Sequence, residues 1–249
     1  EAGKVVEKYF EKEILKDLKE DKSIVTLADK ESEEVIKKII FEAFPAHSIL
    51  GEETGMNGAK SDHVWYVDPI DGTTNFANGI PIFAISIALV HEGQVIVAVV
   101  YNPATGSLFY AERNKGTYFN DKKISVSKDD ETKCIVTTAS GREKENRSLA
   151  KNLQYYLLEK IRSVRNLGSS ALELSFVARG SLEANIQIGL SSYDFAAGTL
   201  LVEEAGGKIT KLDGSPWKFP DNYFIASNGV FHDLLVGEVQ KQKEKLGII

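Results

Sequence analysis

The most informative stretch of this chain runs Val64-Trp65-Tyr66-Val67-Asp68-Pro69-Ile70-Asp71-Gly72-Thr73-Thr74-Asn75-Phe76. Its first four residues are apolar and have high strand propensity, which predicts a strand that runs into a polar turn. Carboxylate oxygens are the ligands that hard divalent cations prefer. Gly72 and Thr73 precede a predicted short helix around Phe76, where free backbone N–H groups bind phosphate oxygens. The stretch therefore favours metal-assisted phosphate chemistry.

The segment Asp68 to Asp71 has the residue preferences of a type I turn, with Asp first and Pro second. Two carboxylates about 4 Å apart repel by roughly 4 kcal/mol at an effective dielectric constant near 20, unless a proton or a cation lies between them. A divalent cation bound between the two carboxylates is the simplest way to remove this repulsion. Taken alone, turn and capping hydrogen bonds explain both aspartates equally well.

Three other carboxylates are candidates for the same site, and each has an ordinary alternative. Glu52 and its neighbour Glu53 follow a short apolar run, where a solvated loop is common. Asp194 begins a predicted helix, which is a typical position for an N-cap. Asp29 follows Thr26 at capping-box spacing. No one of these three carboxylates, taken alone, establishes that it belongs to a cation site.

Composition narrows the class of protein. The chain has 249 residues, 43% of them hydrophobic, and a net charge of −6, which favours a small-molecule enzyme over a nucleic-acid-binding protein. A single cysteine, Cys134, excludes an intrachain disulfide and favours the reducing cytoplasm. No apolar run is long enough to span a membrane. The four histidines lack zinc-ligand spacing, so an all-oxygen site for Mg²⁺ or Mn²⁺ is expected.

The hydrophobic pattern changes along the chain. It predicts a helix over 31–44, with an apolar stripe made of Val35, Ile36, Ile39, Ile40, Ala43 and Phe44. An antiparallel meander is expected from strands at 82–90, 94–101, 107–111, 117–119 and 124–126. Beyond it, helices near 143–160, 170–179 and 194–205 alternate with strands at 163–165, 182–188, 208–212 and 224–226. We expect an α+β lobe over 1–136 and an α/β lobe over 137–249 that share an interface. The chain opens at Glu1 inside a helical pattern, so we also expect a preceding segment.

The chain resembles the inositol monophosphatase family, within a wider group that includes fructose 1,6-bisphosphatases. The resemblance extends over nearly the whole length and rests on five motifs in the family's order, which are Ile24 to Asp29, Gly51-Glu52-Glu53, Asp68 to Phe76, Gly168 to Ala171, and Tyr193 to Gly198 with Glu204 to Gly207. It implies an α-β-α-β-α layered sandwich and a Mg²⁺-dependent, lithium-sensitive type of phosphomonoesterase, commonly a homodimer, with Mn²⁺ as a possible substitute. The segment Lys19 to Ser23 matches a loop that closes over the metals in that family, although it also fits a solvated connector.

The resemblance also implies residue roles. Glu52, Asp68 and the Ile70 carbonyl would hold one Mg²⁺, and Asp68, Asp71 and Asp194 a second. Thr73 with Asp29 behind it, or Glu52 through a further metal, would position or deprotonate the attacking water. The substrate contacts that it implies are at Asp71, Gly72, Thr73, Arg165, Ser169, Ser170 and Gln187.

The substrate is the least determined part of this interpretation. Tyr193 stands where the family usually has Trp, and Gln187 stands where its members have Glu or Arg. Arg165 matches an Arg of dual-activity members, although a surface position is equally ordinary. We expect a phosphate monoester of a small polyol or sugar, inositol 1-phosphate first and fructose 1,6-bisphosphate in addition. The alternatives are 3′-phosphoadenosine 5′-phosphate, histidinol phosphate, or a non-catalytic binding protein that retains the fold.

Overall fold

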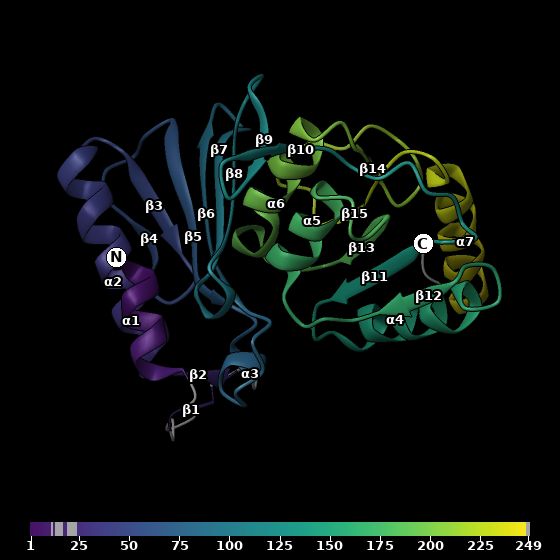
Figure 1. Cartoon of the computed structure of the whole chain (residues 1–249), viewed down its shortest axis with the longest axis horizontal. Helices are drawn as coiled ribbons and strands as arrows, with labels where there is room; N and C mark the ends of the chain where they lie inside the picture. Colours follow the sequence, from purple (N-terminus) through teal and green to yellow (C-terminus); the bar gives the residue numbers. More distant parts are fainter. Residues whose placement is uncertain (11, 13–16, 19–23, 248–249) are drawn as a thin grey trace.

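The computed structural model describes residues 1–10, 12, 17–18 and 24–247. The loop expected at Lys19 to Ser23 lies outside these residues. Five layers follow one another across the molecule (Figure 1): helices, an eight-stranded sheet, helices, a five-stranded sheet and helices. The predicted α-β-α-β-α sandwich is therefore confirmed. Among the described helices, none is both long enough and apolar enough to cross a membrane.

The eight-stranded sheet holds most of the first half of the chain. Its strand order is β10-β9-β8-β7-β6-β5-β3-β4. The six strands from β5 onward pair antiparallel with their neighbours in sequence, which confirms the predicted meander. β3 runs parallel to β5. The strands are β3 (Ser48–Gly51), β4 (Gly55–Asn57), β5 (His63–Asp71), β6 (Ala84–His91), β7 (Gln94–Asn102), β8 (Ser107–Glu112), β9 (Gly116–Phe119) and β10 (Lys122–Ile124). A small ribbon of β1 (Asp17–Leu18) and β2 (Ile24–Val25) is separate from it.

The second half forms the five-stranded sheet, with strand order β12-β11-β13-β15-β14. β11 is parallel to both β12 and β13, and β15 is antiparallel to its two neighbours. The strands are β11 (Ile135–Ser140), β12 (Ser163–Arg165), β13 (Ala184–Ile188), β14 (Lys208–Lys211) and β15 (Tyr223–Ser227). All four strands expected after residue 137 are present. The expected lobe boundary at 136 falls inside β11, so the two-lobe division stays a prediction.

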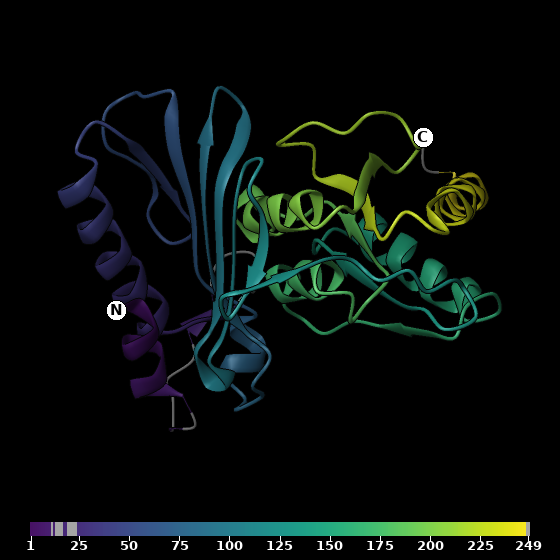
Figure 2. The same cartoon turned by 45° about the horizontal axis from the view of Figure 1, so that its top comes forward.

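Helices α5 (Ser170–Ala178) and α6 (Ser192–Glu204) form the middle layer between the sheets in both views (Figure 1 and Figure 2). Eight of the nine residues of α5 are buried. A helix that is apolar on all sides is stable only when it is covered on all sides, and the two sheets provide that cover. Phe195 and Leu174 lie in the largest buried cluster, together with Phe109 from β8 and Phe224 from β15.

The outer layers are α1 (Ala2–Tyr9) with α2 (Leu27–Ala43) on one side, and α4 (Lys144–Leu157) with α7 (His232–Leu246) on the other. The stripe predicted for α2 is only partly right. Ile36 and Ile40 are buried, but Ile39 is 46% exposed and Phe44 43% exposed. The helix begins four residues earlier than expected, and its first half buries three polar residues, Asp29, Ser32 and Glu33, beside Ala28. Two short helices, α3 (Thr73–Phe76) and η1 (Pro103–Thr105), complete the described fold.

We expect α5 and α6 to pack so closely that even one added methyl group between them lowers the stability of the protein. A Cβ added at Gly198 would lie 2.5 Å from the Leu174 Cβ. Overpacking of this kind costs about 1–3 kcal/mol, which outweighs the helix propensity that alanine gains over glycine. Gly198→Ala should therefore lower the free energy of unfolding, measured by urea denaturation.

Gly237 in α7 provides the matched control, because a Cβ there would meet nothing within 4 Å. Gly237→Ala should raise stability by about 0.5–1 kcal/mol. If both substitutions stabilised the protein, the close approach of α5 and α6 would be wrong.

Candidate active site

The last residues of β5 carry two buried aspartates, Asp68 and Asp71. The predicted type I turn at this point is wrong, because β5 continues through Asp71 in its pairing with β6. The pairing shifts register between Asp68 and Asp71. In a regular strand, residues three apart point to opposite faces of the sheet, whereas a bulge re-aims a side chain. The irregularity thus explains how one strand end offers two carboxylates to one site.

A third carboxylate comes from the other half of the chain. Asp68, Asp71 and Asp194 each offer an oxygen atom that lies within 4.8 Å of the other two. Asp194 also accepts a hydrogen bond of 2.9 Å from the Ser191 N–H, and the two residues form a capping box at the start of α6. Asp194 can therefore cap α6 and belong to the carboxylate cluster at the same time, because the capping bond orients its side chain within the cluster.

Asp71 joins the two halves of the molecule. Its carboxylate accepts hydrogen bonds from the Ser169 hydroxyl at 2.5 Å, the Ser170 N–H at 3.2 Å and the Ala171 N–H at 2.8 Å. These donors form the N-terminus of α5, whose free N–H groups and dipole favour a negative charge. Ser169 and Ser170, expected to contact substrate, here hold Asp71, and both also line the adjoining cavity.

Glu52 directly follows β3 and reaches the same cavity from the neighbouring strand. Its backbone N–H donates to the Val67 carbonyl at 3.0 Å, which continues the pairing of β3 with β5. Ile70, Gly72 and Thr73 also line the cavity. The structure thus brings the five expected metal-binding residues to one place.

Thr73 lines the cavity at the start of α3, and Asp29 contacts it from α2. The predicted capping box at the start of α2 is present, since Asp29 accepts bonds from the Thr26 N–H at 2.8 Å and its hydroxyl at 2.6 Å. The other carboxylate oxygen lies 3.4 Å from the Thr73 hydroxyl, which donates more closely, at 3.0 Å, to the Ile70 carbonyl. The cap and the contact with Thr73 therefore exist together. Burial raises the pKa of Asp29 to about 7.

The cavity has a volume of about 550 Å³ and lies where the two halves of the chain meet. Its lining includes the carboxylates and the Gly72-Thr73 backbone, together with residues from the segment after β11 and from α4. Three exposed charged residues, Arg142, Glu143 and Arg147, also line the cavity. Tyr193 lines the cavity next to Asp194, as the resemblance implied.

Burial and crowding raise the pKa values of the cluster. The pKa of Asp68 lies well above its ordinary range because of burial and, next, the charges of Glu52 and Asp71. That of Asp194 is raised by burial and then by Asp71 and Glu52. Burial raises the pKa of Asp71 to about 7, although the bonds from Ser169 and α5 act in the opposite direction. A cluster that resists ionisation in this way, and that offers only oxygen atoms, fits a hard divalent cation.

Two residues expected at the substrate lie elsewhere. Gln187 is buried, with its amide donating to the Ser170 hydroxyl and to Asn185 Oδ1, both at 2.7 Å, and it is not among the residues that line the cavity. Arg165 is exposed at the end of β12 and donates to the Val164 carbonyl and the Ser163 hydroxyl. Direct substrate contacts by Gln187 and Arg165 remain predictions that this arrangement does not support.

Sequence reasoning missed Glu173, a fully buried carboxylate of α5 that lines the cavity. It accepts bonds from the Leu167 N–H at 2.6 Å and the Asn185 amide at 2.8 Å, and burial raises its pKa to about 8. The available signal was a single charged residue inside an otherwise apolar helical segment. Such a residue indicates a buried polar group, but the sequence does not show that its carboxylate binds the loop before α5.

A layered sandwich with an oxygen-only carboxylate cluster at the junction of its two halves defines the class as a phosphomonoesterase of the sugar-phosphatase type. The chain belongs to the inositol monophosphatase family, whose pattern it matches over residues 1–244.

Named relatives support this assignment. The chain is 38% identical over 224 residues to the inositol-1-monophosphatase of Mesorhizobium japonicum, covering 87% of this chain and 83% of that protein. It is 34% identical over 247 residues to the fructose-1,6-bisphosphatase/inositol-1-monophosphatase of Aquifex aeolicus, with coverage of 98% and 92%. The Nus factor SuhB of Pasteurella multocida is 35% identical over 231 residues, with coverage of 91% and 86%. The solved structure of the Thermotoga maritima IMPase superposes with a TM-score of 0.91 at 33% identity, covering 99% of this chain and 95% of that one.

The raised pKa values predict how stability and cation binding depend on pH. The pKa of Asp71 rises from 3.8 to about 7 on folding, so its folded form keeps a proton that the unfolded chain has lost. Its contribution to stability is therefore complete below about pH 4 and declines as the pH rises through 7. A divalent cation replaces that proton, so stabilisation by the cation should grow over the same range.

The measurement is the difference in melting temperature with and without a saturating divalent cation, taken near pH 5 and near pH 8. We expect a clearly larger difference near pH 8. An equal difference at both pH values would contradict the assignment of the cluster as a cation site.

Proposed function

We propose that this protein hydrolyses a phosphate monoester of a small polyol or sugar with Mg²⁺, and that inositol 1-phosphate is the first candidate substrate. Fructose 1,6-bisphosphate is the second, in line with the name of the Aquifex relative. The observation that carries the proposal is the convergence of Asp68, Asp71 and Asp194 in a cavity that also exposes Gly72 and Thr73. This arrangement puts a candidate cation site beside backbone groups suited to phosphate.

Charge explains why such a site requires cations. A phosphate monoester is an anion, and the same cavity is lined by Glu52 and by the aspartate cluster. Two like unit charges about 4 Å apart repel by roughly 4 kcal/mol at an effective dielectric constant near 20. The cavity is therefore unfavourable for a phosphate until cations neutralise the carboxylates. Arg142 and Arg147 also line the cavity and favour the approach of an anion, although Glu143 lines it as well.

The residues fit two cation positions. We assign Glu52, Asp68 and the Ile70 carbonyl to one Mg²⁺, and Asp68, Asp71 and Asp194 to the other, with Mn²⁺ as a substitute. Bound Mg²⁺ supplies a coordinated water of lowered pKa and neutralises charge on the phosphate. Since Asp71 and Asp194 are each held by backbone N–H groups at a helix start, the protein fixes their orientation before any ligand arrives.

Asp29 and Thr73 are assigned to the attacking water. The Thr73 hydroxyl carries one proton and has two acceptors, the Ile70 carbonyl and Asp29. If Thr73 passes its proton to Asp29 while its oxygen takes one from a water in the cavity, the net transfer is from that water to the Asp29 carboxylate. Positioned proton acceptors of this type typically contribute about 10²–10⁴-fold to rate. Glu52 is the alternative acceptor on the same side of the cavity.

Other functions remain distinct candidates. The same chemistry would serve 3′-phosphoadenosine 5′-phosphate or histidinol phosphate, because those esters differ only in the leaving alcohol. The Nus factor name of one relative favours a regulatory binding protein that retains the fold. In this chain the whole carboxylate set is present and converges, which favours the enzyme. A homodimer and a cytoplasmic location stay predictions.

Asp68→Asn should abolish Mg²⁺-dependent phosphate release while leaving the fold intact, because Asp68 is assigned to both cations. The loss should exceed about 10³-fold, as for removal of a central electrostatic group. Phosphate release is measured with inositol 1-phosphate, fructose 1,6-bisphosphate and 3′-phosphoadenosine 5′-phosphate, each with Mg²⁺ or EDTA.

Asp62→Asn is the matched control, since Asp62 is exposed just before β5. It should keep wild-type rates. A wild-type protein that releases no phosphate from any ester of a broad panel would refute the enzymatic proposal, and an active Asp68→Asn variant would refute the cation assignment.

A further inference from the structure

The first half of α2 presents a buried face made of polar residues. Asp29, Ser32 and Glu33 are all 0% exposed, and their spacing places them on one side of the helix. Burying polar groups is unfavourable unless each finds a hydrogen-bond partner. The partners here come from three segments that carry site residues, which are the start of α3, the end of β5 and the turn after β3. The polar face of α2 is therefore joined to the site.

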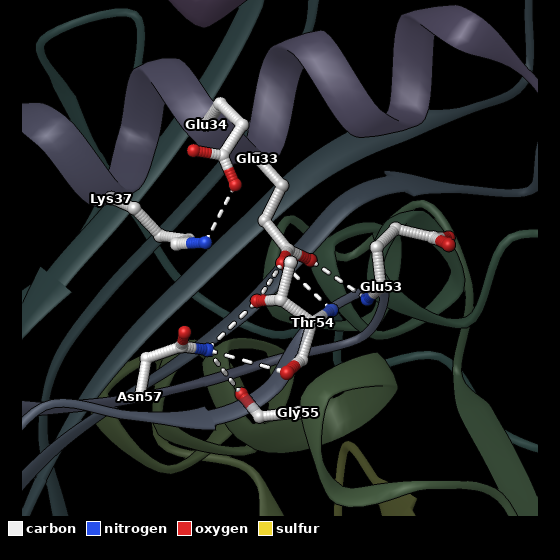
Figure 3. Close-up of polar contacts among 7 residues, drawn as sticks. All are labelled: Glu33, Glu34, Lys37, Glu53, Thr54, Gly55 and Asn57. Carbon is white, nitrogen blue, oxygen red and sulfur yellow. Dashed lines mark hydrogen bonds and ion pairs between the residues drawn. The ribbon is translucent and has the colours of Figure 1, made fainter.

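The contacts of α2 are specific to those segments. Asp29 lies against the Thr73 hydroxyl, and the Ser32 hydroxyl is 3.4 Å from the Pro69 carbonyl. Glu33 makes the most extensive contact. Its carboxylate accepts hydrogen bonds from the Glu53 N–H at 2.8 Å, the Thr54 N–H at 3.0 Å and the Thr54 hydroxyl at 2.5 Å. Figure 3 shows the side chain reaching from α2 into the turn that connects β3 to β4.

The turn is shaped around this carboxylate. A Cβ added at Gly51 would overlap the carboxylate of Glu33, so a larger residue there would require that carboxylate to leave its place beside the end of β3. Gly51 and Glu53 flank Glu52, the residue assigned to a cation. The backbone on one side of Glu52 is thus in contact with Glu33, and on the other side it is hydrogen-bonded to it.

Glu33 forms no ion pair with a lysine or arginine of the described part of the chain. The nearby Lys37 pairs instead with the exposed Glu34, at 2.6 Å (Figure 3). The buried charge of Glu33 is satisfied by the N–H and O–H donors of the turn. A carboxylate that accepts several such bonds holds its donors in one arrangement. Outer residues that orient a metal ligand typically affect cation affinity or activity by about 10–100-fold.

We propose that Glu33 is a positioning residue, which holds the turn so that the Glu52 carboxylate is directed at the cation site. This inference rests on the proposed function only in taking Glu52 as a cation ligand. A purely structural role would stabilise the turn without any effect on cation binding.

The test compares Glu33→Gln with Glu34→Gln, the same change at the neighbouring exposed residue of α2. Glu33→Gln keeps one side-chain oxygen and replaces the other with an NH2 group, which cannot accept from the N–H or O–H donors of the turn that bond to that oxygen. The turn should therefore lose at least one of its three bonds and its fixed arrangement. Binding of Mn²⁺ without substrate is measured by electron paramagnetic resonance, and the Mg²⁺ concentration for half-maximal activity is measured separately. Glu33→Gln should weaken cation binding by about 10–100-fold, and Glu34→Gln should leave it unchanged.

A double-mutant cycle with Glu52→Gln separates positioning from stability. If Glu33 acts through Glu52, Glu33→Gln should weaken cation binding in the wild-type background but change it less than about 2-fold in the Glu52→Gln background. Equal effects in both backgrounds, or a lowered melting temperature with unchanged cation binding, would overturn the proposal.

Thr54→Val keeps both backbone donors and removes only the hydroxyl, so it serves if Glu33→Gln does not fold. It should weaken cation binding by about 3–10-fold, as expected when one hydrogen bond of typical net strength is lost. Unchanged binding in that variant would count against Glu33. A wild-type protein that binds Mn²⁺ but hydrolyses no ester would refute the proposed function and leave the role of Glu33 to be decided by the binding data.

Discussion

Repulsion among carboxylates is the constraint on which the arrangement of this protein depends. Asp68, Asp71, Asp194 and Glu52 reach one cavity from two strands of one sheet and from a helix of the middle layer. Holding these groups together and away from water is unfavourable without protons or cations. The raised pKa values of the aspartates reflect their burial first and the charges of their neighbours after it. The rest of the fold has to supply the free energy that opposes this repulsion. Functional sites commonly store strain of this kind and depend on the scaffold to maintain it.

Helices on two sides of the site supply that support. α5 and α6 both begin at the cavity, where N–H groups at their starts bond to Asp71 and Asp194. Behind these polar starts the two helices are buried between the sheets and contact each other closely at Gly198, so a rigid core fixes the carboxylates. The outer helix α2 acts from the other side. Its second half packs on the sheet through Ile36 and Ile40, while its polar first half holds by hydrogen bonds the loops that carry site residues. Loops that bind ligands need such support, because their own contacts rarely define a single conformation.

Local patterns in the chain were enough to predict the meander, the helices α4 to α6 and the strand Ser163–Arg165, because periodicity and turn residues act over a few positions. The ordered motifs also selected Glu52, Asp68, Asp71 and Asp194, which all line one cavity; their roles as cation ligands stay predictions. Residue preferences failed at Asp68 to Asp71, where pairing with β6 replaced the expected turn by a strand with a shifted register.

Only the tertiary structure decided which polar groups meet. The sequence left the substrate roles of Gln187 and Arg165 open, whereas in the structure Gln187 is buried and bonded to Ser170 and Arg165 lies on the surface. Glu33 and Glu173 are ordinary acidic residues of two helices until the fold places them against the turn after β3 and the loop before α5. Spacing along a chain determines the face of an element on which a residue lies. The partner across that face depends on long-range packing, which no local pattern encodes.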